Sequence, residues 1–233
     1  MASLTYPLLR SVALRGSILT AVGFGVGQVI RLGGNLLLTR LLVPDAFGLM
    51  SIAGVMYIGL SLLSDIGLEA GIVRDPHGDD PTFLDTAWTL QSARGVLLWL
   101  VSLVIAWPVA SFYAEARLLW LIPLVGVSLV LGGFTAPSLI LLKRHMAIAH
   151  LVALDITVQL VMVTALVLLA RQYPQPWVLA LGYLIPAGLR GAWSHWLSRA
   201  RPPRWRLDRA MTHDLLRFGG WFWVATALYF LAS

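Results

Sequence analysis

The sequence contains no cysteine and few charged residues. Without cysteine, the chain has neither a disulfide framework nor a thiolate metal site. Charged side chains make up 12% of its 233 residues, about half the share found in a soluble domain. These charges leave uncharged stretches at 46–64, 95–114 and 118–142. Because roughly 20 apolar helical residues cross the hydrocarbon core of a bilayer, such stretches predict a multi-pass membrane protein surrounded by phospholipid.

The sequence also lacks the GxxxxGK[ST] loop that holds nucleotide phosphates, and we expect no bound cofactor. In a soluble protein, a net charge of +6 and a pI of about 10.3 would suggest a nucleic-acid partner. Here the basic residues lie at the ends of apolar segments, where they orient helices, so we expect no nucleic-acid partner. Polar residues are scattered along the segments instead of forming an acid–base or metal constellation, which does not favour an enzyme.

Seven apolar segments predict an all-α fold, a polytopic bundle of transmembrane helices. Six of them lie at 14–39, 45–69, 84–113, 117–141, 147–170 and 177–197, and the seventh begins near 218. We expect 1–197 to form a six-helix membrane lobe, 198–217 a basic interfacial linker and 218–233 the start of a seventh helix. Because the 16 residues after Arg217 are fewer than the ~20 that span a bilayer, we expect the chain to be the front portion of a longer protein.

The basic residues predict the orientation of the bundle. If the N-terminus is cytoplasmic, the outer side receives Arg40, Arg117 and Arg171. The cytoplasmic side then receives a larger group: Arg10, Arg15, Arg74, Lys143, Arg144, Arg199, Arg201, Arg204, Arg206, Arg209 and Arg217. This excess predicts a cytoplasmic N-terminus by the positive-inside rule.

Local signals indicate where helices begin, bend and approach one another. Pro44 fits the first position of a helix, with Asp45 in its first turn. Thr82 and Asp85 have the spacing of a capping box for the third segment. The pair Gly23–Gly27 has the spacing that allows close helix packing. Four prolines inside apolar segments predict kinks: Pro108, Pro123, Pro137 and Pro186.

The stretch SLLSDIGLEAGIVR, residues 61–74, places Asp65 and Glu69 one helical turn apart. Such a pair is compatible with a catalytic pair, a cation site or the wet end of a membrane helix. Counted from Pro44, the two carboxylates lie about 31 and 37 Å along the segment, beyond the hydrocarbon core. This depth favours the wet end of a helix. Asp65, Glu69 and Arg74 are therefore candidates for contacts that close a cytoplasmic gate.

Two stretches resemble a known family. The stretch LLLTRLLVPDAFGLMSIAGVMYIGLSLLSDIGLEAGIVR (36–74) resembles the first two helices of bacterial polysaccharide transporters, and GDDPTFLDTAWTLQSARG (78–95) continues the resemblance into the third. The residues DLLRFGGWFW (214–223) look like the start of that family's second half. The resemblance implies the multidrug/oligosaccharidyl-lipid/polysaccharide fold, in which two helical lobes face each other across a central cavity.

For function, the resemblance implies a flippase in the bacterial plasma (inner) membrane. Such a protein passes undecaprenyl-diphosphate-linked oligosaccharide units across the membrane by alternating access, for O-antigen, exopolysaccharide or capsule synthesis. Its partners would be the lipid-linked oligosaccharide and other polysaccharide-assembly proteins. The alternatives are a drug or cation antiporter of the same superfamily and a membrane enzyme or subunit of polysaccharide assembly. An antiporter needs a buried carboxylate, whereas the first segment carries an arginine, which favours an anionic cargo.

Three arginines lie inside apolar segments: Arg31, Arg94 and Arg190. A charge there costs roughly 2.5–3.5 kcal/mol on insertion scales, so each arginine needs an explanation. They either snorkel to the interface, Arg31 near the outer quarter of the membrane, or face a hydrated cavity and bind the diphosphate of a lipid carrier. Four amides are candidates for hydrogen bonds to sugar hydroxyls, or for contacts between helices: Gln28, Asn35, Gln91 and Gln159.

Three remaining features favour simpler interpretations. Asp155 lies near the start of the fifth segment, and we interpret it as an interfacial residue. The loop RDPHGDD (74–80) has three acids and one histidine, but its composition is typical of a solvated loop, and we expect no metal site. The basic stretch 199–218 suits contact with anionic lipids at the cytoplasmic leaflet.

Overall fold

The computed structural model describes residues 5–64, 67–74, 78–145, 147–199, 201–209 and 211–212. The described residues form helices only, which confirms the predicted all-α fold. In chain order these are α1 (Thr5–Leu41), α2 (Pro44–Leu63), α3 (Leu68–Arg74), α4 (Pro81–Phe112), α5 (Leu118–Gly133), α6 (Ser138–Arg144), α7 (Ile148–Gln172) and α8 (Pro176–Leu197).

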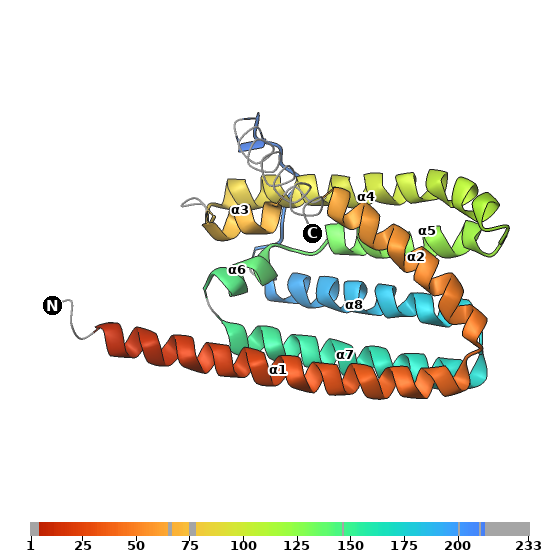
Figure 1. Ribbon diagram of the computed structural model, residues 1–233. Helices are drawn as coiled ribbons and strands as arrows, with labels where there is room; N and C mark the ends of the chain where they lie inside the picture. Colours follow the sequence, from red (N-terminus) through yellow and green to blue (C-terminus); the bar gives the residue numbers. More distant parts are fainter. Residues whose placement is uncertain are drawn as a thin grey trace, which may run out of the picture.

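The long helices run side by side in layers (Figure 1). Helix α1 packs along α7, α8 lies between α7 and α5, and α4 packs on the far side of α5. Helix α2 crosses α5 and α8 at an angle, and the short helices α3 and α6 contact each other at one end of the bundle. At the other end, α1 leads into α2, α4 into α5 and α7 into α8. Of the basic residues that the structure describes, Arg40, Arg117 and Arg171 therefore lie at this end, and Lys143 and Arg144 of α6 lie at the other.

Several helices are long and apolar enough to cross a membrane. Within the described residues, four single helices qualify, over Leu19–Leu41, Pro44–Leu62, Pro81–Phe112 and Ile148–Gln172. Helices α5 and α6 qualify together as one bent span. These spans agree with five of the predicted membrane segments. The sixth segment is present as α8 but is not among the qualifying spans, and its 22 residues lie lengthwise between α5 and α7.

The predicted single helix over 45–69 is wrong, because the structure breaks it. Helix α2 ends at Leu63, and α3 starts anew at Leu68, directly after Gly67 with a φ of 61°. A positive φ is accessible to glycine at little cost, whereas it ends an α-helix. Glu69 therefore lies on a separate helix and does not share a continuous helix face with position 65. Asp65 itself lies outside the described residues.

The predicted helix over 117–141 is also broken. Helices α5 and α6 meet at an angle of 64°, and Pro137 lies between them, not inside a helix. Side chains from α8 hold the break: Ser194 Oγ accepts the backbone N–H of Ala136 at 2.8 Å, and Ser138 Oγ donates to the Ser194 carbonyl at 2.7 Å. The other three prolines, Pro108, Pro123 and Pro186, lie inside helices as predicted.

The predicted capping box at Thr82 and Asp85 is also wrong. The N-cap of α4 is Asp80, whose carboxylate accepts the backbone N–H of Thr82 at 2.6 Å, and Pro81 occupies the first turn. Aspartate is a favoured N-cap because its side chain satisfies a backbone donor at the helix start. Asp85 is thereby left available for a partner outside α4. At α2, by contrast, Pro44 and Asp45 occupy the first turn as predicted.

The linker after α8 lies against α4. Residues 202–208 form no helix, and the backbone N–H groups of 204, 206 and 208 donate to side chains of α4. Arg204 N donates to Asp85 Oδ1 at 3.1 Å, and Arg206 N donates to Thr89 Oγ1 at 3.1 Å. Trp205 packs against Trp88, with 4.7 Å between the ring centroids. The linker is thus fixed to the lobe, a contact that the predicted leaflet interaction did not include.

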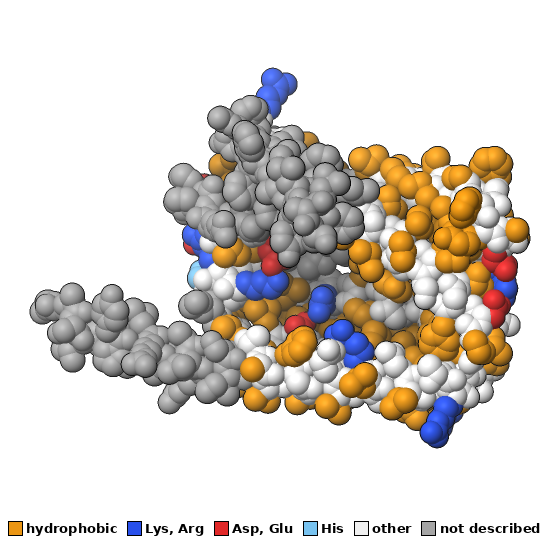
Figure 2. Space-filling model, viewed as in Figure 1, with side chains coloured by type: hydrophobic (Ala, Val, Ile, Leu, Met, Phe, Trp, Pro, Cys, Tyr) orange, Lys and Arg blue, Asp and Glu red, His pale blue; other side chains and the backbone are white. Residues whose placement is uncertain are grey.

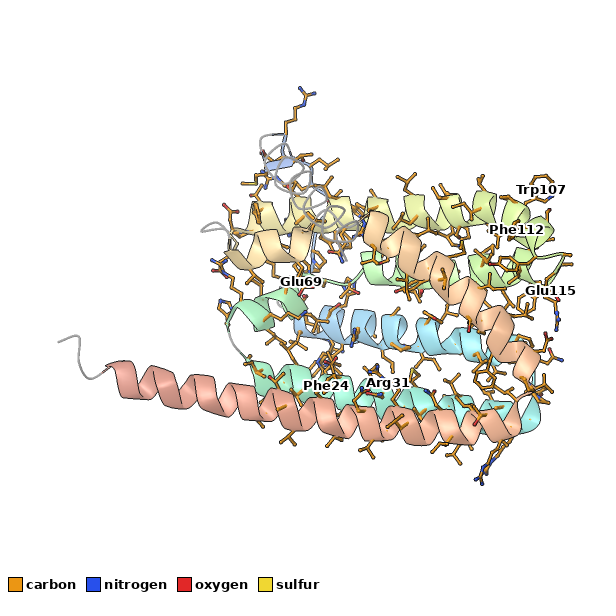
Figure 3. All side chains as sticks on the ribbon, viewed as in Figure 1. Phe24, Arg31, Glu69, Trp107, Phe112 and Glu115 are labelled. Carbon is orange, nitrogen blue, oxygen red and sulfur yellow. The ribbon has the colours of Figure 1, made fainter. Side chains whose placement is uncertain are left out.

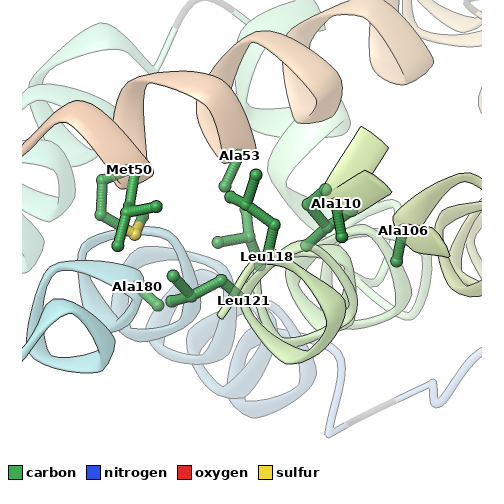
Figure 4. Close-up of a cluster of buried hydrophobic side chains, with 10 residues drawn as sticks. Met50, Ala53, Ala106, Ala110, Leu118, Leu121 and Ala180 are labelled. Atoms are coloured by element: carbon green, nitrogen blue, oxygen red, sulfur yellow. The ribbon is translucent and has the colours of Figure 1, made fainter. Parts of the chain in front are cut away.

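The core is built from small and aliphatic side chains. One cluster joins α2, α4, α5 and α8 (Figure 4) and includes Leu118, Leu121 and Ala180, each less than 1% exposed. Helices α4 and α5 approach each other closely at two glycines, since a Cβ added to Gly95 would lie 3.2 Å from the Cα of Gly133. Such close packing of backbones is typical of helices in membranes.

Candidate functional site

Two adjoining cavities are hollowed into one face of the lobe. The larger, with a volume of about 680 Å³, lies between α1, α7 and α8, and is called here the α1 cavity. The other, with a volume of about 550 Å³, is lined by α2 to α8 and is called the central cavity. Five residues line both: Asp155, Gly182, Tyr183, Pro186 and Arg190. The cavities are therefore two compartments of one groove, and Figure 2 shows charged side chains gathered in the hollow above α1.

An ion pair lies where the two compartments meet. Arg190 Nη2 donates to Asp155 Oδ1 at 2.8 Å. Arg190 is seven residues before the end of α8, and Asp155 is seven residues after the start of α7. The pair therefore lies about 10 Å from the end of the bundle at which α7 starts and α8 ends. Both side chains are half-exposed to the groove. Asp155, interpreted from the sequence as an interfacial residue, is thus the partner of a predicted site residue.

Arg94 lines the central cavity from α4 and also fixes the end of α2. Its guanidinium donates to the Ser61 carbonyl at 2.9 Å and to Ser64 Oγ at 2.9 and 3.1 Å. These acceptors belong to the last turn of α2, where carbonyl groups lack helical partners and the helix dipole is negative. Arg94 is therefore both a groove residue and the cap of a broken helix.

Arg31 lines the α1 cavity together with Asn35. Figure 3 shows it on the side of α1 that faces the other helices. One turn on either side, Gly27 contacts Gln159 and Gly34 contacts Val163 on α7. Arg31 therefore lies beside the middle of α7. Among the described residues, none forms a hydrogen bond or ion pair with it. The close contact of Gly23 with Val152 confirms the predicted packing of this glycine face.

The predicted amides differ in their surroundings. Gln91 Nε2 donates to the Gly132 carbonyl at 3.2 Å, and Gln159 Nε2 donates to the Gly27 carbonyl at 2.9 Å. Both amides thus join helices while lining a cavity. Gln28 lines neither cavity. The structure therefore brings six of the seven predicted binding residues to the groove.

A second ion pair lies at the end of the central cavity, near α3. Glu69 on α3 pairs with Lys143 on α6, and both residues line the cavity. The predicted gate residue Glu69 thus has a basic partner within the same lobe. Of the other two gate candidates, Asp65 lies outside the described residues, and so does the side chain of Arg74 at the end of α3.

Comparison with known proteins places the chain in a family. Residues 37–233 match the family model described as polysaccharide biosynthesis protein. The chain belongs to this family. The match covers most of the sequence and confirms the resemblance to bacterial polysaccharide transporters. Comparison with curated proteins and with solved structures gave no match.

The groove gathers charged side chains between apolar helices. Among the described residues, four basic side chains line it, Arg31, Arg94, Lys143 and Arg190, against the two acids Glu69 and Asp155. Each acid is paired with one of these cations. The groove therefore carries an excess of positive charge inside an otherwise apolar bundle.

The loop interpreted as solvated has partners other than a metal. Asp79 accepts a hydrogen bond from Arg144 Nε at 3.0 Å and lies 3.3 Å from His145 Nε2, and Asp80 caps α4. Within the described part of the chain, no three histidine or acidic side chains converge in a way that suits a metal ion. The remaining loop candidates, Asp75 and His77, lie outside the described residues.

A separate ion cluster lies at the opposite end of the bundle. Arg117, at the start of α5, donates to both oxygens of Glu115 at 2.8 and 2.9 Å and pairs with Asp45 of α2 at 2.7 Å. The hydrogen bond from Arg117 holds the pKa of the Glu115 carboxyl below its ordinary value. The two acids in turn raise the pKa of Arg117. This cluster joins the start of α2 to the turn between α4 and α5, and its members line neither cavity.

Proposed function

We propose that this protein moves a lipid-linked oligosaccharide with a diphosphate headgroup across the bacterial inner membrane. The observation that carries the proposal is the convergence of Arg31, Arg94 and Arg190, from three different helices, on one groove. Membership of the polysaccharide biosynthesis family supports the class of cargo. The N-terminus is cytoplasmic in this proposal, and the groove forms one wall of a path that opens to each side in turn.

Arginine suits a diphosphate for two physical reasons. The guanidinium stays charged at any physiological pH, and its planar fork of donors matches two phosphate oxygens at once. Charge-assisted hydrogen bonds of this kind are about twice as strong as neutral ones. Asn35, also exposed in the α1 cavity, offers a neutral donor and acceptor for sugar hydroxyls. The groove thus combines a cationic part for the diphosphate with polar positions for the sugar.

The sign of the charge argues against the antiporter alternative. A drug or cation antiporter needs a carboxylate that is available to its cargo, whereas Asp155 and Glu69 are each engaged by a cation. We propose a transporter without a chemical step, acting beside the other proteins of polysaccharide assembly. Undecaprenyl diphosphate is the carrier that this proposal assigns to the cargo.

The test replaces Arg31 by glutamine in the native gene. Arg31→Gln keeps a polar side chain of similar length and removes the charge, so we expect polysaccharide export to fall roughly 10- to 100-fold, as expected from the loss of one charged hydrogen-bond donor. The matched control is Arg40→Gln, on the same helix but outside both cavities. Protein amount in the membrane is measured alongside export. Unchanged export in Arg31→Gln, Arg94→Gln and the triple variant with Arg190→Gln would overturn the proposal.

A further inference from the structure

The Arg190–Asp155 ion pair is not explained by the stability of the fold. Its two side chains are 50% and 59% exposed, and ion pairs exposed to that degree contribute little to stability. Each charge is also unfavourable inside an apolar helix. A site that only had to bind an anion would need the arginine without the aspartate. The aspartate therefore needs its own explanation.

We propose that Asp155 is an internal counter-anion, which occupies Arg190 until the anionic cargo displaces it. This inference rests on the proposed function, because it takes the cargo to carry a diphosphate. Asp155 Oδ1 accepts the hydrogen bond from Arg190 Nη2 at 2.8 Å. A phosphate oxygen accepts from the same donors of a guanidinium. Cargo and carboxylate thus compete for one cation at the point where the two compartments join.

The surrounding charges distinguish Arg190 from the other groove arginines. Four other charged side chains among the described residues line the same two cavities, from α1, α3, α4 and α6: Arg31, Glu69, Arg94 and Lys143. Among the described residues that line the cavities, Glu69 is paired with Lys143, and Asp155 is paired with Arg190. Arg31 has no partner among the described residues and attracts any anion that enters. A ligand that takes the Nη2 donor of Arg190 must outcompete a carboxylate.

Two consequences follow for the transport cycle. A neutral ligand or a weakly charged one does not displace Asp155, so the pair selects for a diphosphate. Because the exchange replaces one ion pair by another, cargo binding gains less free energy than binding to a bare arginine, and release is faster. A transporter needs such moderate affinity, since its ligand must leave as well as enter. Asp155 is a specificity-determining residue in this scheme.

The experiment measures binding of farnesyl diphosphate to the purified full chain in detergent, with farnesyl monophosphate and farnesol for comparison. Asp155→Asn keeps the shape of the side chain and removes its charge. We expect it to bind farnesyl diphosphate about two- to fivefold more tightly than the parent, as expected from the coupling of an exposed ion pair. We also expect Asp155→Asn to prefer the diphosphate over the monophosphate less strongly. Asp155→Glu, which restores the charge, should bind like the parent.

Three controls make the outcomes distinct. Asp45→Asn removes an acid at the opposite end of the bundle and should leave binding unchanged. Adding Arg190→Gln to Asp155→Asn should abolish the gain. Thermal unfolding checks that each variant is folded, and Asp155→Ser replaces Asp155→Asn if the latter is not. Unchanged or weaker binding by the uncharged variants overturns the counter-anion, while weaker binding by Arg31→Gln and Arg190→Gln still supports the proposed function. If those two arginine variants bind like the parent, the proposed function itself fails.

Discussion

Replacing Asp85 by alanine should release the linker from α4. The carboxylate of Asp85 is 8% exposed and accepts the Arg204 backbone N–H at 3.1 Å, while Arg201 Nη2 lies 3.5 Å from its other oxygen. A hydrogen bond to a charged group contributes roughly 1.5–3 kcal/mol, and the longer contact with Arg201 adds little. The open fraction of the linker should therefore rise roughly 10- to 100-fold in Asp85→Ala.

Limited trypsin digestion measures this opening. Trypsin cleaves after Arg204 and Arg206 only when the extended segment leaves α4. When opening and closing are faster than cleavage, the cleavage rate follows the open fraction, so cleavage should accelerate by the same factor. The control Asp45→Ala removes an acid from the other end of the bundle and should cleave like the parent. The double variant Thr86→Val with Thr89→Val gives an independent test, because it removes two other acceptors of linker N–H groups.

Equal cleavage rates in the parent and Asp85→Ala, in protein whose thermal unfolding temperature is unchanged, would show that Asp85 does not hold the linker on α4. The same holds if the threonine variant is as protected as the parent. A loss of thermal stability without faster cleavage would show that Asp85 supports α4 itself and not the linker.

Three further predictions concern stability. Gly95→Val would place a Cβ 2.5 Å from a carbonyl oxygen of α5, and overpacking of about 1–3 kcal/mol should lower the unfolding temperature by roughly 3–10 °C. In the control Gly25→Ala, the added Cβ meets no atom within 4 Å, so the unfolding temperature should not fall. The pKa of Glu115 is lowered in the folded state, so its ionised carboxylate stabilises the fold above the ordinary pKa of 4.5, and this stabilisation is lost as the pH falls through the folded-state pKa. When thermal unfolding is compared between pH 7 and pH 3, Glu115→Gln should therefore lose less stability than the parent. Arg94→Gln should lower the unfolding temperature more than Arg31→Gln does, because only the former leaves the end of α2 uncapped; equal shifts would argue against the cap.

The helices that the sequence predicted correctly are those whose signals are local. Apolar runs of sufficient length depend only on neighbouring residues, and α1, α4, α7 and α8 follow them. The proline at the start of α2 is a local signal of the same kind. The two helix breaks were missed because their stabilising partners are distant in sequence. Arg94 caps α2 from 33 residues away, and Ser194 holds the α5–α6 break from 58 residues away. Gly67 was the one local signal of the first break, and glycine is too common in membrane helices to identify it alone.

The candidate site was predictable to the extent that charge in an apolar segment is rare. Arg31, Arg94 and Arg190 stand out on that ground, and all three line the groove. The role of Asp155 was not predictable, because position along a helix gives depth but not the helix that a side chain faces. Gln28 illustrates the same limit, since it lies one residue after Gly27 and yet lines neither cavity.

The three arginines differ in how much of their charge the fold already uses. Arg94 donates to the last turn of α2, where the negative end of the helix dipole offsets part of its charge. Arg190 shares its guanidinium with Asp155. Arg31 has no partner among the described residues, and therefore presents its charge most fully to the groove. In the proposed function, an anion entering the groove is therefore attracted first by Arg31, and at Arg190 it competes with the carboxylate of Asp155.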